Sequence, residues 1–511
     1  MAQAHPFFRH RMSSMKRRMF TPVCHQGPLP ADDIKRRRFL QASSAAGLGC
    51  LLASPANAFP GLVDLMGQPL SRSVANPAAG APTIDTIRAL LLASLAKTSP
   101  VVGGFFAALG DFFIPTAGEK PETLWQRYTD AKIEEAVINL VKADMAGLSD
   151  VARLYRDAVR DGDKDTIKTQ SIAARTVFAQ RLPQFQMSGH EIALLPYFTL
   201  AATLEMTLLR DMALTGKEIG LSDDNVESVK EDLTQRIKRY GDYLVEPMKK
   251  AVAKAIDDNP HSNDPAGRNQ PLTAVLSLHK QMSLDVIDVF STWKAFDARK
   301  YPNGARIVLD RQVFSPIIGW WERDSKPPQG IPKSWRFAPP DIRSVEFWVR
   351  TQWRTEWMYG FKVTYADSTE LTTGEMSGTR TLLDMSDRYA TNVAGHSGSA
   401  IGGMKLRTHP DNRLHQVGPD PYESQRVITA FAPRGHRLSS LRSIGKGVNS
   451  GEGAVSGFVA GFQLLDKEAA PDSTDLLMQL SPDLPPQVMQ WLAMQASSSQ
   501  RIAGTELPSN F

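Results

Sequence analysis

Histidines, carboxylates and glycine-rich turns are the parts of this sequence that could carry catalytic chemistry. His190 and Glu191 are adjacent, but no second histidine follows at the spacing of a zinc-dependent protease. The segment 395–399 reads Gly-His-Ser-Gly-Ser and lacks the final glycine of a nucleophile elbow. The glycine-rich segment 445–453 lies between expected strands, where no helix follows to hold a phosphate. These patterns predict turns rather than catalytic sites.

The sequence gives no sign of a metal site or of a redox-active cysteine after residue 58. His409 and His415 have no convincing partners for a metal ion. Both cysteines, Cys24 and Cys50, lie within the first 58 residues, so the rest of the chain can form neither a disulfide nor a thiolate site. We therefore predict a protein that is not an enzyme and that needs no cofactor and no metal ion.

The composition is that of an ordinary globular protein with an uneven charge. The 511 residues are 42% hydrophobic and 22% charged, and this length allows two to four domains. The net charge is +5, but residues 1–58 contain nine Lys or Arg and only two Asp, so the remainder is slightly acidic. A nucleic-acid partner is not expected for this remainder.

The basic N-terminal region predicts an export signal. Paired arginines precede Phe39 and Leu40, a weakly apolar stretch follows at 42–53, and a small-x-small pattern closes the region. This order resembles a twin-arginine signal, which exports folded proteins, and predicts a secreted or periplasmic protein. A basic surface patch and a lipoprotein cleaved at Cys50 are weaker alternatives. The signal residues are Arg36, Arg37, Arg38 and Ala58.

Residues from about Thr83 to Phe296 follow a helical pattern. Two stripes, within 226–248 and 272–293, place apolar residues three and four apart, which gives a helix one apolar face. A break is expected near Gly147 and a kink at Pro247. His279 lies inside the second stripe and is expected to be a packed core residue.

One helical segment is apolar on all sides. Between Ile192 and Leu209 the only charged residue is Glu205. These residues would form about 27 Å of helix, close to the thickness of a bilayer core. Such a helix is either the centre of a large bundle or a membrane span. Six amphipathic segments are available to surround it, so we expect it to be buried in the water-soluble form.

After about Ala305 the apolar residues alternate, which predicts strands. Three of the expected strands open on a glycine, at Gly360, Gly403 and Gly457. This faint threefold repeat is typical of a prism of three sheets. The tail after 466 is polar, with one short helical candidate near 487–496.

Two ordered blocks of this sequence resemble the insecticidal delta-endotoxins, the three-domain crystal toxins. The first contains Leu-Pro-Gln-Phe at 182–185, Leu-Leu-Pro-Tyr at 194–197 and Leu-Leu-Arg-Asp at 208–211. The second begins at Met282 and ends in Asp-Ala-Arg-Lys-Tyr-Pro at 297–302. The resemblance covers roughly 83–466, and the family's third domain, a jelly roll, is expected to be absent.

The resemblance implies an α+β multidomain fold. An N-terminal seven-helix bundle would surround the central apolar helix, and a three-sheet antiparallel β-prism would follow. The expected divisions are a signal peptide at 1–58, a flexible leader at 59–82, a pore-forming domain at 83–300, a receptor-binding domain at 301–466 and a tail at 467–511.

The resemblance also implies a pore-forming toxin. The helices at about 165–182 and 190–213 would insert into a target membrane as a hairpin, oligomerise and form a cation-permeable pore. A charge at mid-membrane is costly, so Glu205 would face the lumen, pair or be protonated; a hydrogen-bonded role inside the soluble bundle is an equal alternative. The residues of this hairpin are Ile167, Arg175, Phe178, Leu182, Glu191, Leu195, Tyr197, Leu204, Glu205 and Leu208.

Recognition of a membrane receptor or glycan is expected at a loop of the prism. Aromatic and arginine side chains dominate binding hot spots, and they are concentrated between residues 350 and 357. The candidates are Arg350, Trp353, Arg354, Glu356 and Trp357, and the stretch Ser386–Ser399 comes next. The alternative function is a secreted lectin-like protein that binds carbohydrate and has a purely structural bundle.

Overall fold

The computed structural model describes residues 84–96, 98–99, 101–115, 118–129, 134–262, 267–320, 331, 333–335, 337–352, 355–397, 400–420, 426–443, 453–467 and 500–504. The expected signal peptide with Arg36, Arg37, Arg38 and Ala58, and the expected leader, lie outside these residues. Trp353, Arg354 and the helical candidate near 487–496 lie outside them as well.

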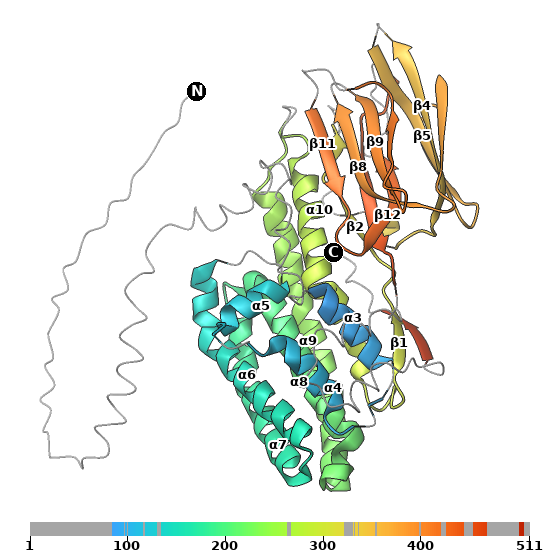
Figure 1. Cartoon of the computed structure of the whole chain (residues 1–511). Coiled ribbons are helices and arrows are strands. Elements are labelled where there is room, and N and C mark those ends of the chain that lie inside the picture. The colour runs from blue at the N-terminus through green and yellow to red at the C-terminus, as the bar shows by residue number, and fades with distance from the viewer. Residues whose placement is uncertain are drawn as a thin grey trace, which may run out of the picture. The chain divides into compact units, whose positions relative to one another are not determined.

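The first half of the described chain is helical (Figure 1). The α-helices are α3 (Ile84–Leu95), α4 (Gly104–Gly110), α5 (Pro121–Thr129), α6 (Glu135–Asp161), α7 (Lys164–Arg181), α8 (Glu191–Thr215), α9 (Asp223–Asp257), α10 (Gln270–Met282) and α11 (Asp288–Phe290). The π-helical turn Ser283–Ile287 makes α10 and α11 continuous. Short 3-10 turns are η2 (Asp111–Phe113), η3 (Leu182–Gln186), η4 (Gly216–Ile219), η6 (Trp293–Phe296) and η7 (Lys333–Trp335).

Local capping fixes the ends of the long helices. The Asp163 carboxylate accepts a hydrogen bond from the backbone N of Thr166 at 3.0 Å, where α7 begins. The Ser222 hydroxyl does the same for Asn225 at the start of α9. α6 ends at Gly162, whose φ of 76° suits a residue without a Cβ atom.

The break predicted near Gly147 is wrong, because α6 runs through this residue without interruption. A Cβ atom at position 147 would lie 2.5 Å from Cζ of Arg181 on α7. The glycine therefore makes room for the arginine, which bonds Asp144 at 3.0 Å and the carbonyl of Ala143 at 3.1 Å. Before it, α5 ends at Thr129 and α6 begins at Glu135.

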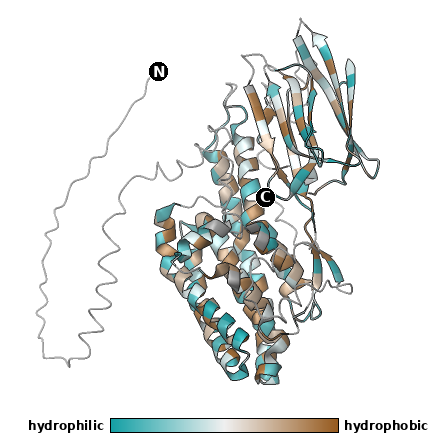
Figure 2. Cartoon of the chain, in the orientation of Figure 1, coloured by the Kyte–Doolittle hydropathy of each residue, from teal (hydrophilic) through white to brown (hydrophobic). Residues whose placement is uncertain are grey.

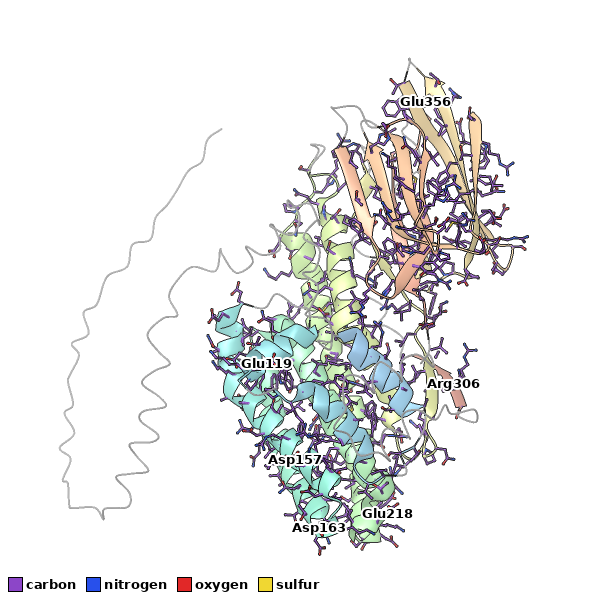
Figure 3. The ribbon with its side chains drawn as sticks, in the orientation of Figure 1. Glu119, Asp157, Asp163, Glu218, Arg306 and Glu356 are labelled. Carbon is purple, nitrogen blue, oxygen red and sulfur yellow. The ribbon has the colours of Figure 1, made fainter. Side chains whose placement is uncertain are left out.

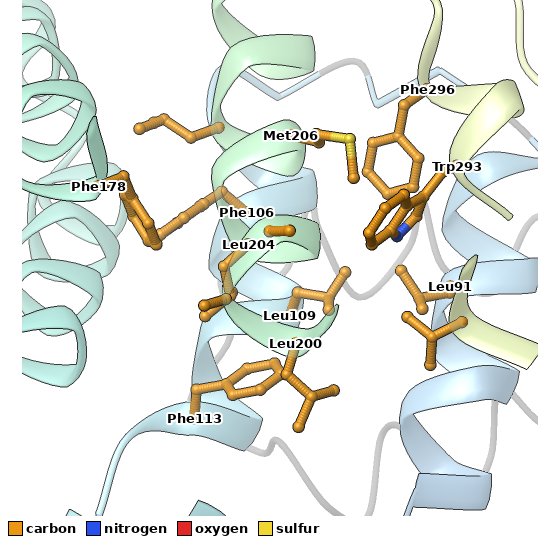
Figure 4. Packing of buried hydrophobic residues seen from close by; sticks show 14 of the residues in the cluster. Leu91, Phe106, Leu109, Phe113, Phe178, Leu200, Leu204, Met206, Trp293 and Phe296 are labelled. Atoms are coloured by element: carbon orange, nitrogen blue, oxygen red, sulfur yellow. The ribbon is translucent and has the colours of Figure 1, made fainter. Parts of the chain in front are cut away.

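Helix α8 forms the centre of the bundle and contacts α4, α5, α6, α7, α9 and α11. Figure 4 shows Leu200, Leu204 and Met206 of α8 among aromatic side chains of α4, α7 and η6. Figure 2 shows hydrophilic residues along α6 and α7. With α10 and α11 taken as one, the described bundle has eight helices rather than seven, because α4 and α5 are separate short helices. The predicted bundle around an apolar helix is thus confirmed.

Three sheets of the second half form the expected prism. The strands are β1 (Ala305–Val308), β2 (Gln312–Phe314), β3 (Ile318–Gly319), β4 (Ile342–Gln352), β5 (Thr355–Tyr365), β6 (Glu370–Gly374), β7 (Thr379–Asp384), β8 (Tyr389–Ser397), β9 (Ile401–His409), β10 (Leu414–Val417), β11 (Arg426–Phe431), β12 (His436–Ser443), β13 (Gly457–Leu464) and β14 (Gln500–Ala503). Antiparallel sheets run in the orders β6-β5-β4-β7, β10-β9-β8-β11 and β12-β13-β2, with β3 also on β13.

The faint sequence repeat corresponds to equivalent positions in the sheets. Gly360 lies in β5 and Gly403 in β9, each the second strand of its sheet. Gly374 and Gly418, with φ of 75° and 76°, pack against them: a Cβ atom on either would lie 3.1 Å from the opposing glycine Cα. The repeated glycines therefore permit the same close strand crossing twice.

The tail contains a strand that the sequence did not predict. β14 pairs in parallel with β1, and Ile502 packs against the core of the bundle. Four residues with no alternation of polar and apolar side chains, in a polar tail, give no pattern to be recognised, and their partner lies almost 200 residues earlier.

Candidate functional site

Among the described residues, one helix is long and apolar enough to cross a membrane by length and composition, and it is α8 with its η4 extension, Glu191–Ile219. In the structure this helix is covered by protein, since 89% of its most apolar window is buried. α8 therefore lies in the core of the bundle. The contacts of its few polar groups show which neighbouring elements hold it there.

Glu205 is the charged group at the middle of α8, and it is fully buried. Its Oε2 accepts a hydrogen bond from the hydroxyl of Tyr240 on α9. Its Oε1 lies 3.2 Å from Nη1 of Arg236, also on α9, and that Nη1 donates to the Tyr240 hydroxyl at 2.7 Å. The carboxylate is thus held by a charge and a hydroxyl from the neighbouring helix.

The electrostatics of this triad follow from burial. Burial raises the pKa of Glu205, although Arg236 and Tyr240 oppose the shift. Burial and the adjacent carboxylate both raise the pKa of Tyr240, so its hydroxyl stays protonated and donates. Arg236 is mostly buried as well, and its guanidinium compensates a charge that would otherwise lie in an apolar core.

The triad extends to α7 through Asp232. The Oδ1 of Asp232 accepts from Nε of Arg236 at 3.1 Å, and its Oδ2 accepts from Nη2 of Arg175 at 3.0 Å. Arg175 lies on α7, so α9 holds both helices of the predicted hairpin through one connected set of charges. We call Arg175, Glu205, Asp232, Arg236 and Tyr240 the α9 cluster.

The polar contacts of the loop between α7 and α8 lie near the surface. Glu191 accepts a hydrogen bond from the backbone N of Gly189 at 2.9 Å, and its other oxygen lies 3.7 Å from Nζ of Lys250. Its position at a helix N-terminus, with backbone N–H groups nearby, lowers its pKa. The polar contacts at this end of the hairpin are thus partly exposed, while Leu182 and Phe185 of η3 are buried in the core.

The other end of α8 is anchored firmly. Arg210 donates to the carbonyls of Phe296 and Tyr301 at 3.0 and 2.8 Å, and both belong to the exit from the bundle. The carboxylate of Asp211 accepts from the backbone N of Phe106 at 2.7 Å, at the start of α4. Burial raises the pKa of Asp211 to about 7. The C-terminal end of α8 is therefore tied to the chain that leads into the prism.

The remaining hairpin residues proposed from the sequence are apolar and buried. α7 turns Ile167 and Phe178 inward, as its amphipathic pattern predicted. Tyr197 stacks near Trp125, with ring centroids 6.3 Å apart. The buried members of the predicted set are Ile167, Phe178, Leu182, Leu195, Tyr197, Leu204 and Leu208.

The predicted recognition loop lies at the end of the β4–β5 hairpin, where Figure 3 labels Glu356. Arg350 is exposed and its guanidinium lies over the ring of Tyr359, 4.2 Å from the centroid. Arg350 and Glu356 line a hollow of about 380 Å³. Trp357 is half-buried and packs against Tyr359, Ala400 and Ala454, so it contributes to the prism more than to the surface.

Sequence reasoning found the buried carboxylate but missed its partners. A lone charge in an apolar segment signals that a partner is required. The packing of α8 against α9 decides which residues of α9 become the partners of Glu205. In the sequence, Arg236 cannot be told from the other charged residues of an amphipathic helix. The described residues contain no group of three or more His, Cys, Asp or Glu that could hold a metal ion.

A helical bundle around a buried apolar helix, followed by a three-sheet prism, is a fold shared with insecticidal crystal proteins. The chain matches the insecticidal delta-endotoxin Cry8Ea1 of Bacillus thuringiensis with a TM-score of 0.58 at 18% identity, over 75% of this chain and 74% of that one. It matches PirB with a TM-score of 0.57 at 15% identity, over 76% of this chain and 95% of that one.

Sequence comparison points to the same group of proteins. Residues 119–297 match the model of the delta endotoxin N-terminal domain. The chain is 27% identical to the pesticidal crystal protein Cry1Ia of Bacillus thuringiensis subsp. kurstaki over 48% of this chain and 35% of that protein. It is 25% identical to the parasporal crystal protein Cry18Ca of Paenibacillus popilliae over 44% and 32%. Residues 119–297 are therefore similar to the N-terminal domain of the delta endotoxins, and the chain matches about a third of the length of these relatives.

The α9 cluster predicts a specific stability pattern. Arg236→Met leaves Glu205 buried without its cation and should lower the free energy of unfolding by about 3–5 kcal/mol. Burial raises the pKa of Glu205, so the free-energy cost of keeping this residue ionised in the core grows as the pH rises. The loss of unfolding free energy in Arg236→Met should therefore be larger at pH 8 than at pH 5. Denaturant unfolding measures both.

Two further variants control this measurement. Lys238→Met removes a charge from the same helix whose side chain is 82% exposed, and it should cost less than about 1 kcal/mol. The double variant Glu205→Gln with Arg236→Met removes both charges and should recover part of the loss. Equal stability of Arg236→Met and Lys238→Met would contradict the role given to the cluster.

Proposed function

We propose that this protein is a pore-forming toxin of the delta-endotoxin family that inserts the α7–α8 hairpin into the membrane of a target cell. The observation that carries the proposal is α8 itself. It is long enough to span a bilayer, apolar on every side, and linked by a short turn to an amphipathic partner. A helical hairpin keeps its backbone hydrogen bonds when it moves from protein to lipid, so insertion needs no unfolding.

The polar contacts differ between the two ends of α8, and this difference supports insertion with the α7–α8 turn in front. At the end that leads into α7 the ion pair is partly exposed, although Leu182 and Phe185 of the turn are buried. At the end that leads to the prism, the polar bonds of Arg210 and Asp211 are buried. The turn between α7 and α8 would enter first. The α9 cluster must open at the same time, because it bonds both helices.

In the proposed pore, α7 faces the lumen and α8 faces lipid or its neighbours. α7 buries Ile167 and Phe178 on one side and exposes Thr169, Thr176 and Gln180 on the other. Arg175 and Arg181 lie at the two borders of the buried side, where they pair with α9 and α6. Self-association and cation permeability follow from this arrangement as proposals. Glu205 would then lie in the lumen, be paired or be protonated, since a charge in lipid is costly.

We propose that the prism binds a membrane receptor or a glycan through the β4–β5 hairpin. An exposed arginine, a carboxylate and a hollow lie there, and the tip residues Trp353 and Arg354 follow directly in the sequence. The proposed domains are 83–300 for insertion and 301–466 for recognition, with a tail at 467–511.

Export through the twin-arginine route is proposed from the N-terminal sequence. Replacing Arg36, Arg37 and Arg38 by Lys keeps the charge but removes the guanidinium groups that this route is expected to read. We expect the variant to accumulate in the cytoplasm of the producing cell, as measured by fractionation and immunoblotting. Secretion equal to that of the unmodified chain would contradict the assignment.

A disulfide between α8 and α9 should block the pore. Cys24 and Cys50 are the only cysteines, so a background in which both are Ser makes an engineered pair unique. The pair belongs at facing positions whose Cα atoms lie about 4.4–6.8 Å apart. The oxidised protein should bind target membranes but release no dye from loaded vesicles, and reduction should restore release.

A matched disulfide between α9 and α10 is the control, because it leaves the α7–α8 hairpin free. It should permit dye release in both redox states. Equal release by the oxidised and reduced α8–α9 protein would exclude insertion of this hairpin. If the untethered protein binds target membranes without releasing dye, the lectin-like function is preferred.

Recognition is tested by Trp353→Ala combined with Arg354→Ala. Loss of an aromatic and an arginine at a loop tip should weaken binding to insect gut membrane vesicles by at least about tenfold, since such residues commonly contribute over 1 kcal/mol each. Leu382→Ala, at a side chain on β7 that is 55% exposed, is the control and should leave binding unchanged. Unchanged binding by the double variant would move the site toward Ser386–Ser399.

A further inference from the structure

A buried cluster of charges joins the bundle to the prism. Asp288 on α11 accepts hydrogen bonds from Arg311, in the connection between β1 and β2, with Nε at 2.8 Å from Oδ1. The same carboxylate accepts from Nη1 of Arg88 on α3 at 3.0 Å. Arg88 also pairs with Asp85 at 2.8 Å. With two arginines and two aspartates, this junction cluster is electrically balanced.

A histidine from a third element completes the cluster. His436 begins β12 and is 1% exposed. Its Nδ1 lies 2.8 Å from the carbonyl oxygen of Arg434, and its Nε2 lies 2.7 Å from Nη1 of Arg311. A carbonyl can only accept, so Nδ1 carries the proton. A guanidinium can only donate, so Nε2 is the unprotonated acceptor.

We infer that His436 is a proton-operated latch that closes the bundle–prism junction when neutral and opens it when protonated. A proton on Nε2 would place an N–H group against the N–H of Arg311 and remove the only hydrogen bond that His436 makes to it. The extra charge would also leave the cluster with an excess positive charge in a buried site. The closed junction therefore excludes the charged imidazole.

The surrounding groups leave His436 as the titrating member of the cluster. The charges that face it are Arg311 and, beyond it, Arg88 and Asp288, while Lys467 pairs with Asp310 beside Arg311 at 2.8 Å. Burial, Arg311 and Arg88 hold the pKa of His436 well below its ordinary 6.5. Burial alone would raise the pKa of Asp288, but Arg311 and Arg88 outweigh it and the pKa is lowered.

The lowered pKa values of His436 and Asp288 determine how the stability of the junction changes with pH. A base whose pKa is lowered in the closed state gives stability that is lost as the pH falls below the ordinary histidine value. Asp288 adds its own loss only below the ordinary aspartate value of 3.8. Between pH 7.5 and 5 the contribution of the junction cluster to this opening is thus expected to depend on His436. This inference does not depend on pore formation.

Hydrogen exchange of the full chain in solution tests the latch without a membrane. Exchange rates, corrected for the intrinsic effect of pH, are measured between pH 7.5 and 5 for peptides covering 84–95, 309–314 and 434–440. In the unmodified protein, protection of these peptides should fall below pH 6.5, by at most about tenfold per pH unit for one proton. Peptides covering β9 serve as an internal control.

Three variants decide the assignment. His436→Gln keeps an acceptor for Arg311 but cannot titrate, so junction protection should not change with pH. His415→Gln is the matched control: burial lowers the pKa of this other histidine too, but it lies on β10 away from the cluster. It should behave as the unmodified protein does.

Arg311→Gln provides a second route if His436→Gln does not fold. Without the guanidinium, protonated His436 can pair with Asp288, so protection should be lower at pH 7.5 but should not fall further with acid. The inference is overturned if junction protection in the unmodified protein is constant over this pH range. It is also overturned if either His436→Gln or Arg311→Gln retains the full acid-dependent loss.

Discussion

The structure depends on one constraint: a helix that is apolar on every side must be covered on every side. α8 has this character over most of its length, and six other helices contact it. The long helices α6, α7 and α9 are amphipathic and turn their apolar faces toward it, while the short α4 is buried throughout. The architecture of the bundle is the solution to this packing requirement.

The polar groups of α8 are satisfied in two different ways. Thr199, Thr203 and Thr207 donate to carbonyls four residues earlier, so they need no partner outside the helix. Glu205 depends on α9 instead. A buried ion pair contributes little net stability compared with apolar packing, yet leaving one member alone is costly. The α9 cluster therefore favours one arrangement of the helices without adding much to the barrier against leaving it.

The prism solves a different problem by repetition. Each sheet alone would expose one apolar face, and three sheets cover one another around a common core of side chains such as Phe347, Phe361 and Phe458. The recognition hairpin and the junction cluster lie on different strands, β4–β5 and the start of β12. The hairpin proposed for recognition and the contact with the bundle can thus vary separately within one scaffold.

The sequence by itself determined the elements and their order. Spacing of apolar residues identified α7, α8 and α9, the change to alternation after Ala305 identified the strands, and the repeated glycines indicated a prism. These signals are local, and burial acts on them directly. Gly147 was misread because its neighbour, Arg181, is supplied by another helix.

Tertiary structure alone decided the partners of the buried charges. The pairs of Glu205 with Arg236, Arg175 with Asp232, and Asp288 with Arg88 join residues far apart in the chain, and so does the contact of Arg311 with His436. The pairing of β14 with β1 also joins segments that are far apart in the chain. The type of a side chain indicates that a buried charge needs a partner. Which residue becomes that partner depends on distances of a few ångströms, which are set only after the elements have packed.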